Sequence, residues 1–178
     1  GIDQAKTNND VDQVEQNSTT MINNIQPTVV KKSEARQAID DLAKLKKATI
    51  DLTQEATEEE KEAAKQKVDE EVIKAKNNIA QSTTNSDVEI AKESGKHAID
   101  EIQPEIVKKS VAKQTIDELA KQKKAEIDQT PNATAEEKAA AKAKVDEAVT
   151  EANSSIDQAT NNQGVDDAKG QGIESINH

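Results

Sequence analysis

The chain repeats itself with a period of 77 residues, and this repeat limits the possible folds more than any other feature of the sequence. Residues 28–101 and 105–178 align without a gap and are identical at 40 of 74 positions. Self-similarity at a fixed period of this length indicates one supersecondary unit used several times. We therefore divide the chain into residues 1–27, interpreted as the C-terminal helix of a preceding repeat, and two repeats at residues 28–104 and 105–178.

Apolar residues in each repeat recur at intervals of three and four, which is the spacing of one helix face. In the first repeat this pattern predicts helices over about residues 28–52, 57–81 and 87–103. The second repeat keeps the same apolar faces. The expected core positions are Ala35, Ile39, Leu42, Ile50, Ala64, Val68, Val72, Ala75, Ile79, Val88, Ala91, Gly95, Ile99 and Ile102, then Ala112, Ile116, Leu119, Ile127, Ala141, Val145, Val149, Ala152, Ile156, Val165, Ala168, Gly172 and Ile176.

Local signals mark where the second helix of each repeat begins. Thr57 with Glu60, and Thr134 with Glu137, have the Thr-x-x-Glu spacing of a capping box. In this motif each side chain satisfies the other residue's backbone N–H. Polar turn segments separate the helices within a repeat, whereas only Gln-Pro precedes each new repeat.

These signals predict an all-α fold of tandem up-down-up three-helix bundles. Because Pro is tolerated in the first helical turn, we expect near-continuous helices between bundles, with kinks at Pro27 and Pro104, and an elongated, spectrin-like rod. An alternative division places bundles at residues 9–81 and 86–158 and leaves 163–178 without partners. We consider it less favourable, since collinear helices at the junction cannot fold back on each other.

Two glycines occupy core-facing positions of the third helices, at Gly95 and Gly172. Gly within a helix costs about 1 kcal/mol relative to Ala. We therefore expect these positions to serve close approach between helices.

Composition limits the functions open to such bundles. The chain has no Phe, Tyr, Trp or Cys and carries a formal net charge of -11. With no aromatic platform for bases and no net positive field, we expect no binding of nucleic acid. No apolar run reaches the roughly 20 residues that span a bilayer, so we expect no membrane insertion by this segment. The lack of Cys excludes disulfides and thiolate chemistry.

Candidate catalytic and metal-binding residues are few. His97 has no second histidine one helical turn away, His178 is the last residue, and Glu93 and Glu101 are ordinary surface partners. No Gly-x-Ser-x-Gly elbow or Ser/His/Asp set is present, and no apolar pocket is apparent to shift carboxylate pKa values. We predict no enzyme activity and no catalytic, cofactor-binding or metal-binding site.

Lysines in the first helix of the second repeat form a candidate surface for teichoic acid or another polyanion. Because each repeat is acidic as a whole, we expect most of them to pair instead with glutamates of the second helix. They are Lys108, Lys109, Lys113, Lys121, Lys123 and Lys124. Asn17 and Asn132 begin glycosylation sequons, but the second is better explained as a turn before a helix cap.

Five segments of the chain have a distinctive sequence: Ala48-Thr49-Ile50-Asp51, Lys123-Lys124-Ala125-Glu126-Ile127-Asp128, Pro131-Asn132-Ala133-Thr134-Ala135-Glu136-Glu137-Lys138, Ala141-Lys142-Ala143-Lys144-Val145-Asp146 and Ser155-Ile156-Asp157-Gln158-Ala159-Thr160. They resemble a tandem repeat of unknown function in the stalks of staphylococcal cell-wall-anchored surface proteins such as SasC, FmtB (also called Mrp) and Ebh. The resemblance covers the whole chain, although Leu52-Thr53-Gln54-Glu55 departs from Gln129-Thr130-Pro131-Asn132 in the second repeat.

This resemblance implies an extracellular location, anchoring to the cell wall through sequence outside this segment, and a stalk that carries a distal adhesive region in cell aggregation, biofilm or host attachment. We accordingly expect a structural spacer whose partners are the neighbouring repeats. Two alternatives stay open: a binding module for a host matrix or plasma protein, and self-association of repeats. Against a binding module, Arg36 is the only arginine and there is no aromatic residue to form a hot spot.

Overall fold

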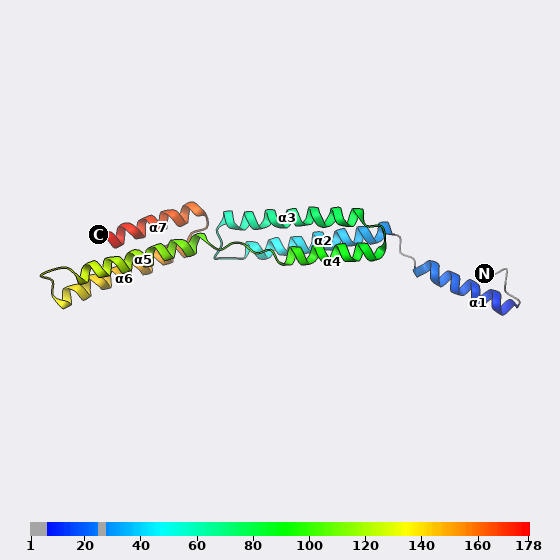
Figure 1. The fold of residues 1–178 in the computed structure, drawn as a ribbon, viewed down its shortest axis with the longest axis horizontal. Coiled ribbons are helices and arrows are strands. Elements are labelled where there is room, and N and C mark those ends of the chain that lie inside the picture. Colours follow the sequence, from blue (N-terminus) through cyan, green and yellow to red (C-terminus); the bar gives the residue numbers. More distant parts are fainter. Residues whose placement is uncertain (1–6, 25–27) are drawn as a thin grey trace. The chain divides into compact units, whose positions relative to one another are not determined.

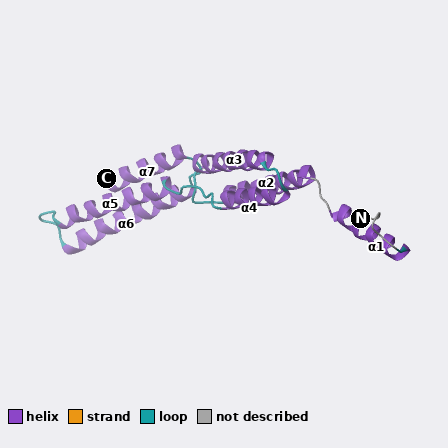
Figure 2. Cartoon of the chain, turned by 45° about the vertical axis from the view of Figure 1, so that its right-hand side comes forward, coloured by secondary structure: helices purple, strands orange, loops and turns teal. Residues whose placement is uncertain are grey.

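The computed structural model describes residues 7–24 and 28–178, and within them every regular element is a helix (Figure 1). The all-α prediction is therefore confirmed, and short loops connect the helices (Figure 2). In the first repeat the helix ends lie within three residues of the expected ones. The helices are α1 (Asn8–Asn24), α2 (Thr28–Asp51), α3 (Glu58–Gln81), α4 (Asn85–Asp100), α5 (Lys108–Asp128), α6 (Ala135–Gln158) and α7 (Asn162–Asn177).

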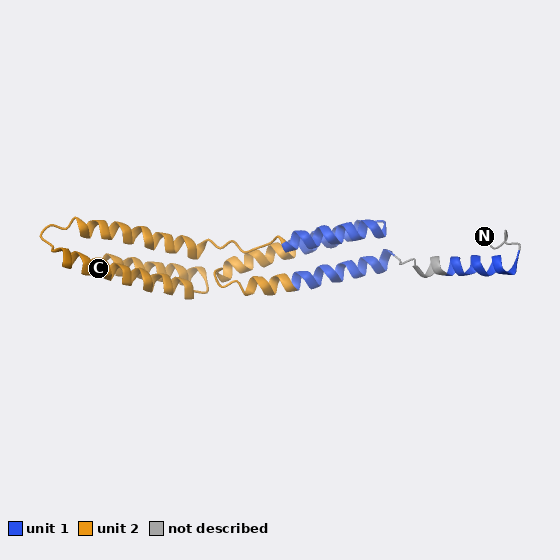
Figure 3. Cartoon of the chain, turned by 90° about the horizontal axis from the view of Figure 1, so that it is seen from below, with its two compact units in different colours: residues 1–44, 70–100 blue, residues 45–69, 101–178 orange. Residues whose placement is uncertain are grey.

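Contacts divide the chain into two compact units (Figure 3). The first unit comprises residues 1–44 and 70–100, and the second comprises residues 45–69 and 101–178. The second unit therefore contains all of α5, α6 and α7, together with the end of the first repeat at which α2 ends and α3 begins.

The second unit has a core of small aliphatic side chains. Its helices α5, α6 and α7 pack on one another pairwise, as an up-down-up bundle requires. Ile116, Ile156 and Val165 are fully buried, one from each helix. Gly172 of α7 lies so close to Ala152 of α6 that an added Cβ would be 2.6 Å from the Ala152 Cβ.

The first unit repeats this arrangement with the aligned residues. A Cβ added to Gly95 of α4 would lie 2.6 Å from the Cβ of Ala75 and 3.0 Å from Cδ1 of Ile39. Asp40 of α2 pairs with Lys76 of α3 at 2.6 Å. These contacts come from three helices, so close packing around the third-helix glycine occurs in both units.

The predicted helix continuity between repeats is wrong at Pro104. α4 ends at Asp100 and α5 begins at Lys108, so residues 101–107 lie outside the helices. Proline removes one backbone donor and disfavours the helical conformation of the residue before it. The N–H groups of Val107 and Lys108, which would face carbonyls of Gln103 and Pro104 in a continuous helix, are donated to a side chain of the first repeat instead. The kink expected at Pro27 falls outside the described residues.

We predict that Gly172→Ala lowers the free energy of unfolding, by about 1–3 kcal/mol, because its Cβ would overlap Ala152 and would lie 2.8 Å from Cδ1 of Ile116. Gly170→Ala is the matched control, since nothing lies within 4 Å of its added Cβ. Removing a helical glycine there should raise stability by up to about 1 kcal/mol. Denaturant unfolding of the two variants measures both effects, and equal midpoints would contradict the close-approach interpretation.

Candidate functional site at the junction of the two repeats

The N-terminus of α3 is built by a capping box, as the Thr-x-x-Glu spacing predicts. The Thr57 N–H donates to Oε1 of Glu60 at 2.9 Å, and the Glu60 N–H donates to Oγ1 of Thr57 at 3.3 Å. The same box recurs in α6, where Thr134 and Glu137 exchange hydrogen bonds of 3.0 and 3.1 Å. The first oxygen of Glu60 is thus used to begin α3.

The second carboxylate oxygen of Glu60 holds the beginning of the next repeat. Its Oε2 accepts hydrogen bonds from the backbone N–H groups of Val107 at 2.8 Å and Lys108 at 3.3 Å. The first N–H groups of a helix have no partner within it, and Val107, the residue preceding α5, makes no side-chain cap. A glutamate of the first repeat therefore caps the first helix of the second.

Two further hydrogen bonds join the beginning of α3 to the loop between α6 and α7. The N–H of Glu58 donates to the carbonyl oxygen of Thr160 at 2.8 Å. The N–H of Asn162 donates to Oε2 of Glu59 at 2.9 Å. The acidic first turn of α3 is therefore used for specific contacts with two separate segments of the second repeat.

A buried lysine completes the junction. Lys109 of α5 is 5% exposed, and its Nζ donates to the carbonyl oxygens of Gln54 at 3.2 Å and Asp157 at 2.8 Å. Burial of a charge is costly unless it is hydrogen-bonded, and here carbonyls from both repeats supply the acceptors. The aligned Lys32 donates to the carbonyl oxygen of Ala80 at 2.8 Å, which corresponds to the Asp157 contact.

The charge of Glu60 is stabilised in this setting. Burial by itself raises the pKa of the Glu60 carboxyl group, but hydrogen bonds from Thr57, Val107 and Lys108 outweigh it and hold the pKa below its ordinary value of 4.5. At neutral pH the Glu60 carboxylate is therefore an anion that accepts hydrogen bonds from backbone N–H groups. Hydrogen bonds to a charged group are stronger than those between neutral groups.

A surface hollow of about 310 Å³ lies beside these contacts. Lys67 and Glu105 form an ion pair of 3.8 Å at its wall. No histidine or cysteine lines it. Of its carboxylates, Glu59 and Glu60 already accept backbone hydrogen bonds and Glu105 is paired with Lys67. The lining residues are Glu59, Glu60, Ala63, Ala64, Lys67, Gln103, Glu105, Val107 and Asn162. This arrangement is suited to packing one chain segment on another rather than to acid–base chemistry.

The lysines considered as a polyanion surface mostly have partners within the bundle. Lys108 pairs with Asp166 of α7 at 2.8 Å, and Lys124 pairs with Asp146 of α6. Aspartates of α6 and α7 serve as partners where glutamates of the second helix were expected from the sequence. The remaining contacts are Lys113 with Asp157, and Lys123 with Glu126 and the carbonyl oxygen of Asn177.

The other sequence candidates do not form a common site. His97 lies exposed on α4 of the first unit, and His178 contacts the carbonyl oxygen of Glu174 at 3.0 Å in the second. Among the described residues no group of three or more His, Cys, Asp or Glu is placed to hold a metal ion. No helix in this part of the chain has the length and apolar character needed to cross a membrane.

Comparison with known proteins supports the presence of two repeats in the chain. The model of a family described as a domain of unknown function, DUF1542, matches residues 31–107 and again residues 108–178. The chain belongs to the DUF1542 family. The resemblance to staphylococcal surface-protein repeats is thereby confirmed, and the two matches are spaced by the period of the internal repeat.

The curated relatives of this DUF1542 chain are much longer proteins. It is 30% identical over 138 residues, 78% of its length, to the extracellular matrix-binding protein EbhA of Staphylococcus aureus strain Newman and to the extracellular matrix-binding protein ebh of strain NCTC 8325. The chain spans 4% and 1% of these relatives, respectively. Their names describe binding proteins and not enzymes. No solved structure matches the chain.

We predict that Glu60→Gln weakens the junction while leaving the α3 cap intact, because glutamine also serves in a capping box but offers one carbonyl oxygen instead of two. The free energy of unfolding should fall by about 1.5 kcal/mol, the lower range for hydrogen bonds to a charged group. Glu137→Gln is the matched control, since Glu137 makes the same cap without a hydrogen bond to a following helix. Its effect on the denaturant midpoint should be small, and equal losses would contradict the second role of Glu60.

The pKa of Glu60 predicts a pH dependence of this contribution. A carboxyl group whose folded pKa is lowered stabilises the fold above its unfolded pKa, here near 4.5, and the contribution is lost as pH falls through the folded pKa. The free energy of unfolding of the parent chain should therefore exceed that of Glu60→Gln by the whole expected amount at pH 7. This difference should be smaller at about pH 3. Denaturant unfolding at the two pH values measures it, and a constant difference would show that the charge of Glu60 contributes nothing.

Proposed function

We propose that this chain is a structural spacer segment of an extracellular, matrix-binding surface protein of the staphylococcal type. Its modules are the repeats at residues 28–104 and 105–178, and anchoring to the cell wall is supplied by sequence elsewhere in the parent protein. In this role the segment is not an enzyme and takes no cofactor. Its mechanism is geometric, because joined modules set the distance between the cell surface and a distal adhesive region.

The observation that carries this proposal is the junction. Three charged side chains that a binding module would direct outward contact the backbone of the adjoining repeat instead: Glu59, Glu60 and Lys109. A spacer needs its modules fixed to each other, and side chains that hydrogen-bond to backbone groups provide this without large apolar anchors.

Two features of the surface agree with a spacer. Lysines of α5 are paired with aspartates of α6 and α7, which reduces their availability to an external polyanion. The net charge of -11 favours solubility and mutual repulsion between neighbouring molecules. Matrix binding by the named relatives is a property of proteins many times longer than this chain.

The proposal predicts that the maximum dimension of the protein grows steadily with each repeat. A second copy of residues 102–178 placed after His178 keeps the repeat in register, because His178 aligns with Glu101. At about 1.5 Å per residue, the 24 residues of α6 measure roughly 36 Å, so the added repeat should lengthen the molecule by about 40 Å. Small-angle X-ray scattering of the two proteins measures the change.

A compact profile with little change in maximum dimension would contradict the spacer. Retention of a matrix protein such as fibronectin by the immobilised chain would favour the alternative, a binding module.

A further inference from the structure

The capping boxes at which the second helices begin consist of the same two residue types, Thr and Glu, but differ in burial. In the first repeat Thr57 is 0% exposed, and Ile50, Ala56 and Ala64 are buried with it. In the second repeat the aligned Thr134 is exposed. The aligned Ile127, Ala133 and Ala141 are all only partly buried. The extra burial in the first repeat occurs where residues 103–108 and 160–162 pack on it.

At the start of α6, groups that correspond to those of the junction have no hydrogen-bond partner among the described residues. One oxygen of Glu137, Oε2, accepts the Thr134 N–H, while its Oε1 accepts no hydrogen bond from the described part of the chain. In Glu60 that remaining oxygen holds two backbone donors. Likewise the Glu58 N–H donates to Thr160, but the aligned Ala135 N–H has no acceptor among the described residues.

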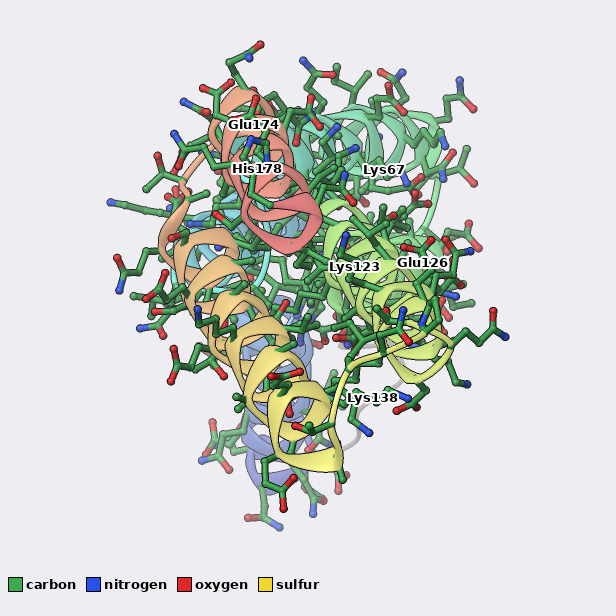
Figure 4. The ribbon with its side chains drawn as sticks, turned by 90° about the vertical axis from the view of Figure 1, so that its left-hand side faces the viewer. Lys67, Lys123, Glu126, Lys138, Glu174 and His178 are labelled. Atoms are coloured by element: carbon green, nitrogen blue, oxygen red, sulfur yellow. The ribbon has the colours of Figure 1, made fainter. Side chains whose placement is uncertain are left out.

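Glu137 also lines a hollow of about 430 Å³. Four of its lining residues, Glu137, Ala140, Ala141 and Lys144, align with Glu60, Ala63, Ala64 and Lys67, which line the hollow at the occupied junction. Figure 4 looks onto this end, where the first turns of α6 face the viewer and Lys138 is labelled beside them. The Lys138 Nζ donates to the carbonyl oxygen of Asp128, which joins the end of α5 to the first turn of α6.

We propose that the first two turns of α6 are a docking surface for the beginning of another repeat of the same kind. Oε1 of Glu137 accepts the N–H groups that precede and begin the incoming first helix, and the Ala135 N–H donates to a carbonyl of the incoming loop between second and third helices. The inference rests on the proposed spacer function, in which repeats are joined in series, and adds the groups that join them.

The Lys109 contact need not be reproduced at this end. Its acceptor in the first repeat is the carbonyl of Gln54, and the aligned Pro131 precedes Asn132, whose φ of 67° gives the α5–α6 loop a left-handed residue. Among the described residues no other non-glycine residue has positive φ, so the α2–α3 loop follows a different path. The docking surface is therefore confined to α6 and its cap.

The test uses the full chain extended by a second copy of residues 102–178, with and without Glu137→Gln. We expect the appended Val107 and Lys108 amides to be protected from hydrogen exchange, and Glu137→Gln to accelerate their exchange about tenfold in NMR measurements. Glu151→Gln is the control, because Glu151 is an exposed glutamate of the same helix outside the docking surface. In the unextended chain Glu137→Gln should leave the denaturant midpoint nearly unchanged.

Amides of the appended core, such as that of Ile116, report whether the added repeat is folded. Protected core amides together with equal exchange of Val107 and Lys108 in Glu137→Gln and Glu151→Gln would overturn the docking surface. The spacer proposal would survive that result if scattering still showed the expected lengthening, and would fail only if the lengthening were absent. Unprotected core amides would show that the second repeat does not support another and would also overturn the inference.

Discussion

Close approach of helices is the constraint on which the rest of this structure depends. Without aromatic side chains, the core consists of Ile, Val, Leu, Ala and Gly, so helices must come near one another for these small groups to touch. The contacts of Gly95 with Ala75, and of Gly172 with Ala152, are where the backbones come close enough to exclude a Cβ. Dispersion attraction falls steeply with distance, so closeness compensates for the small size of the side chains.

The described contacts that join the two repeats are mainly hydrogen bonds. The junction is accordingly made from backbone donors and acceptors that helices leave unpaired at their ends. Glu60 satisfies one donor at the start of its own helix and two at the start of the next. One side chain thus connects the local structure of a helix end to the spacing of whole repeats.

Much of the fold follows from sequence reasoning, because it is encoded locally. The three-and-four spacing of apolar residues locates the helices, and the Thr-x-x-Glu motif locates the beginnings of α3 and α6. The close contacts of the two glycines could also be predicted, because a core-facing glycine destabilises a helix and so indicates a close approach between helices. The Thr-x-x-Asp spacing is a related local signal that the sequence prediction did not use. Thr84 and Asp87 exchange hydrogen bonds at the start of α4, and Thr7 and Asp10 do so at the start of α1.

The junction could not be predicted in the same way, because it depends on the path of the chain after Pro104. The sequence pattern favours a continuous helix there, in which Val107 and Lys108 would need no outside acceptor. Glu60 gives no separate sign of its second role, since the capping box alone accounts for it. Thr57 is buried whereas the aligned Thr134 is exposed, and this difference marks the junction. It can be seen only in the three-dimensional structure.

The cap on α5 also affects how easily that helix forms. Starting a helix is unfavourable because several residues must be ordered before the first hydrogen bond forms. A first repeat that is already folded presents Glu60 as a ready acceptor for the N–H groups of Val107 and Lys108, which lowers this nucleation cost for α5. A folded first repeat therefore acts as a template on which the first turn of the second repeat can form.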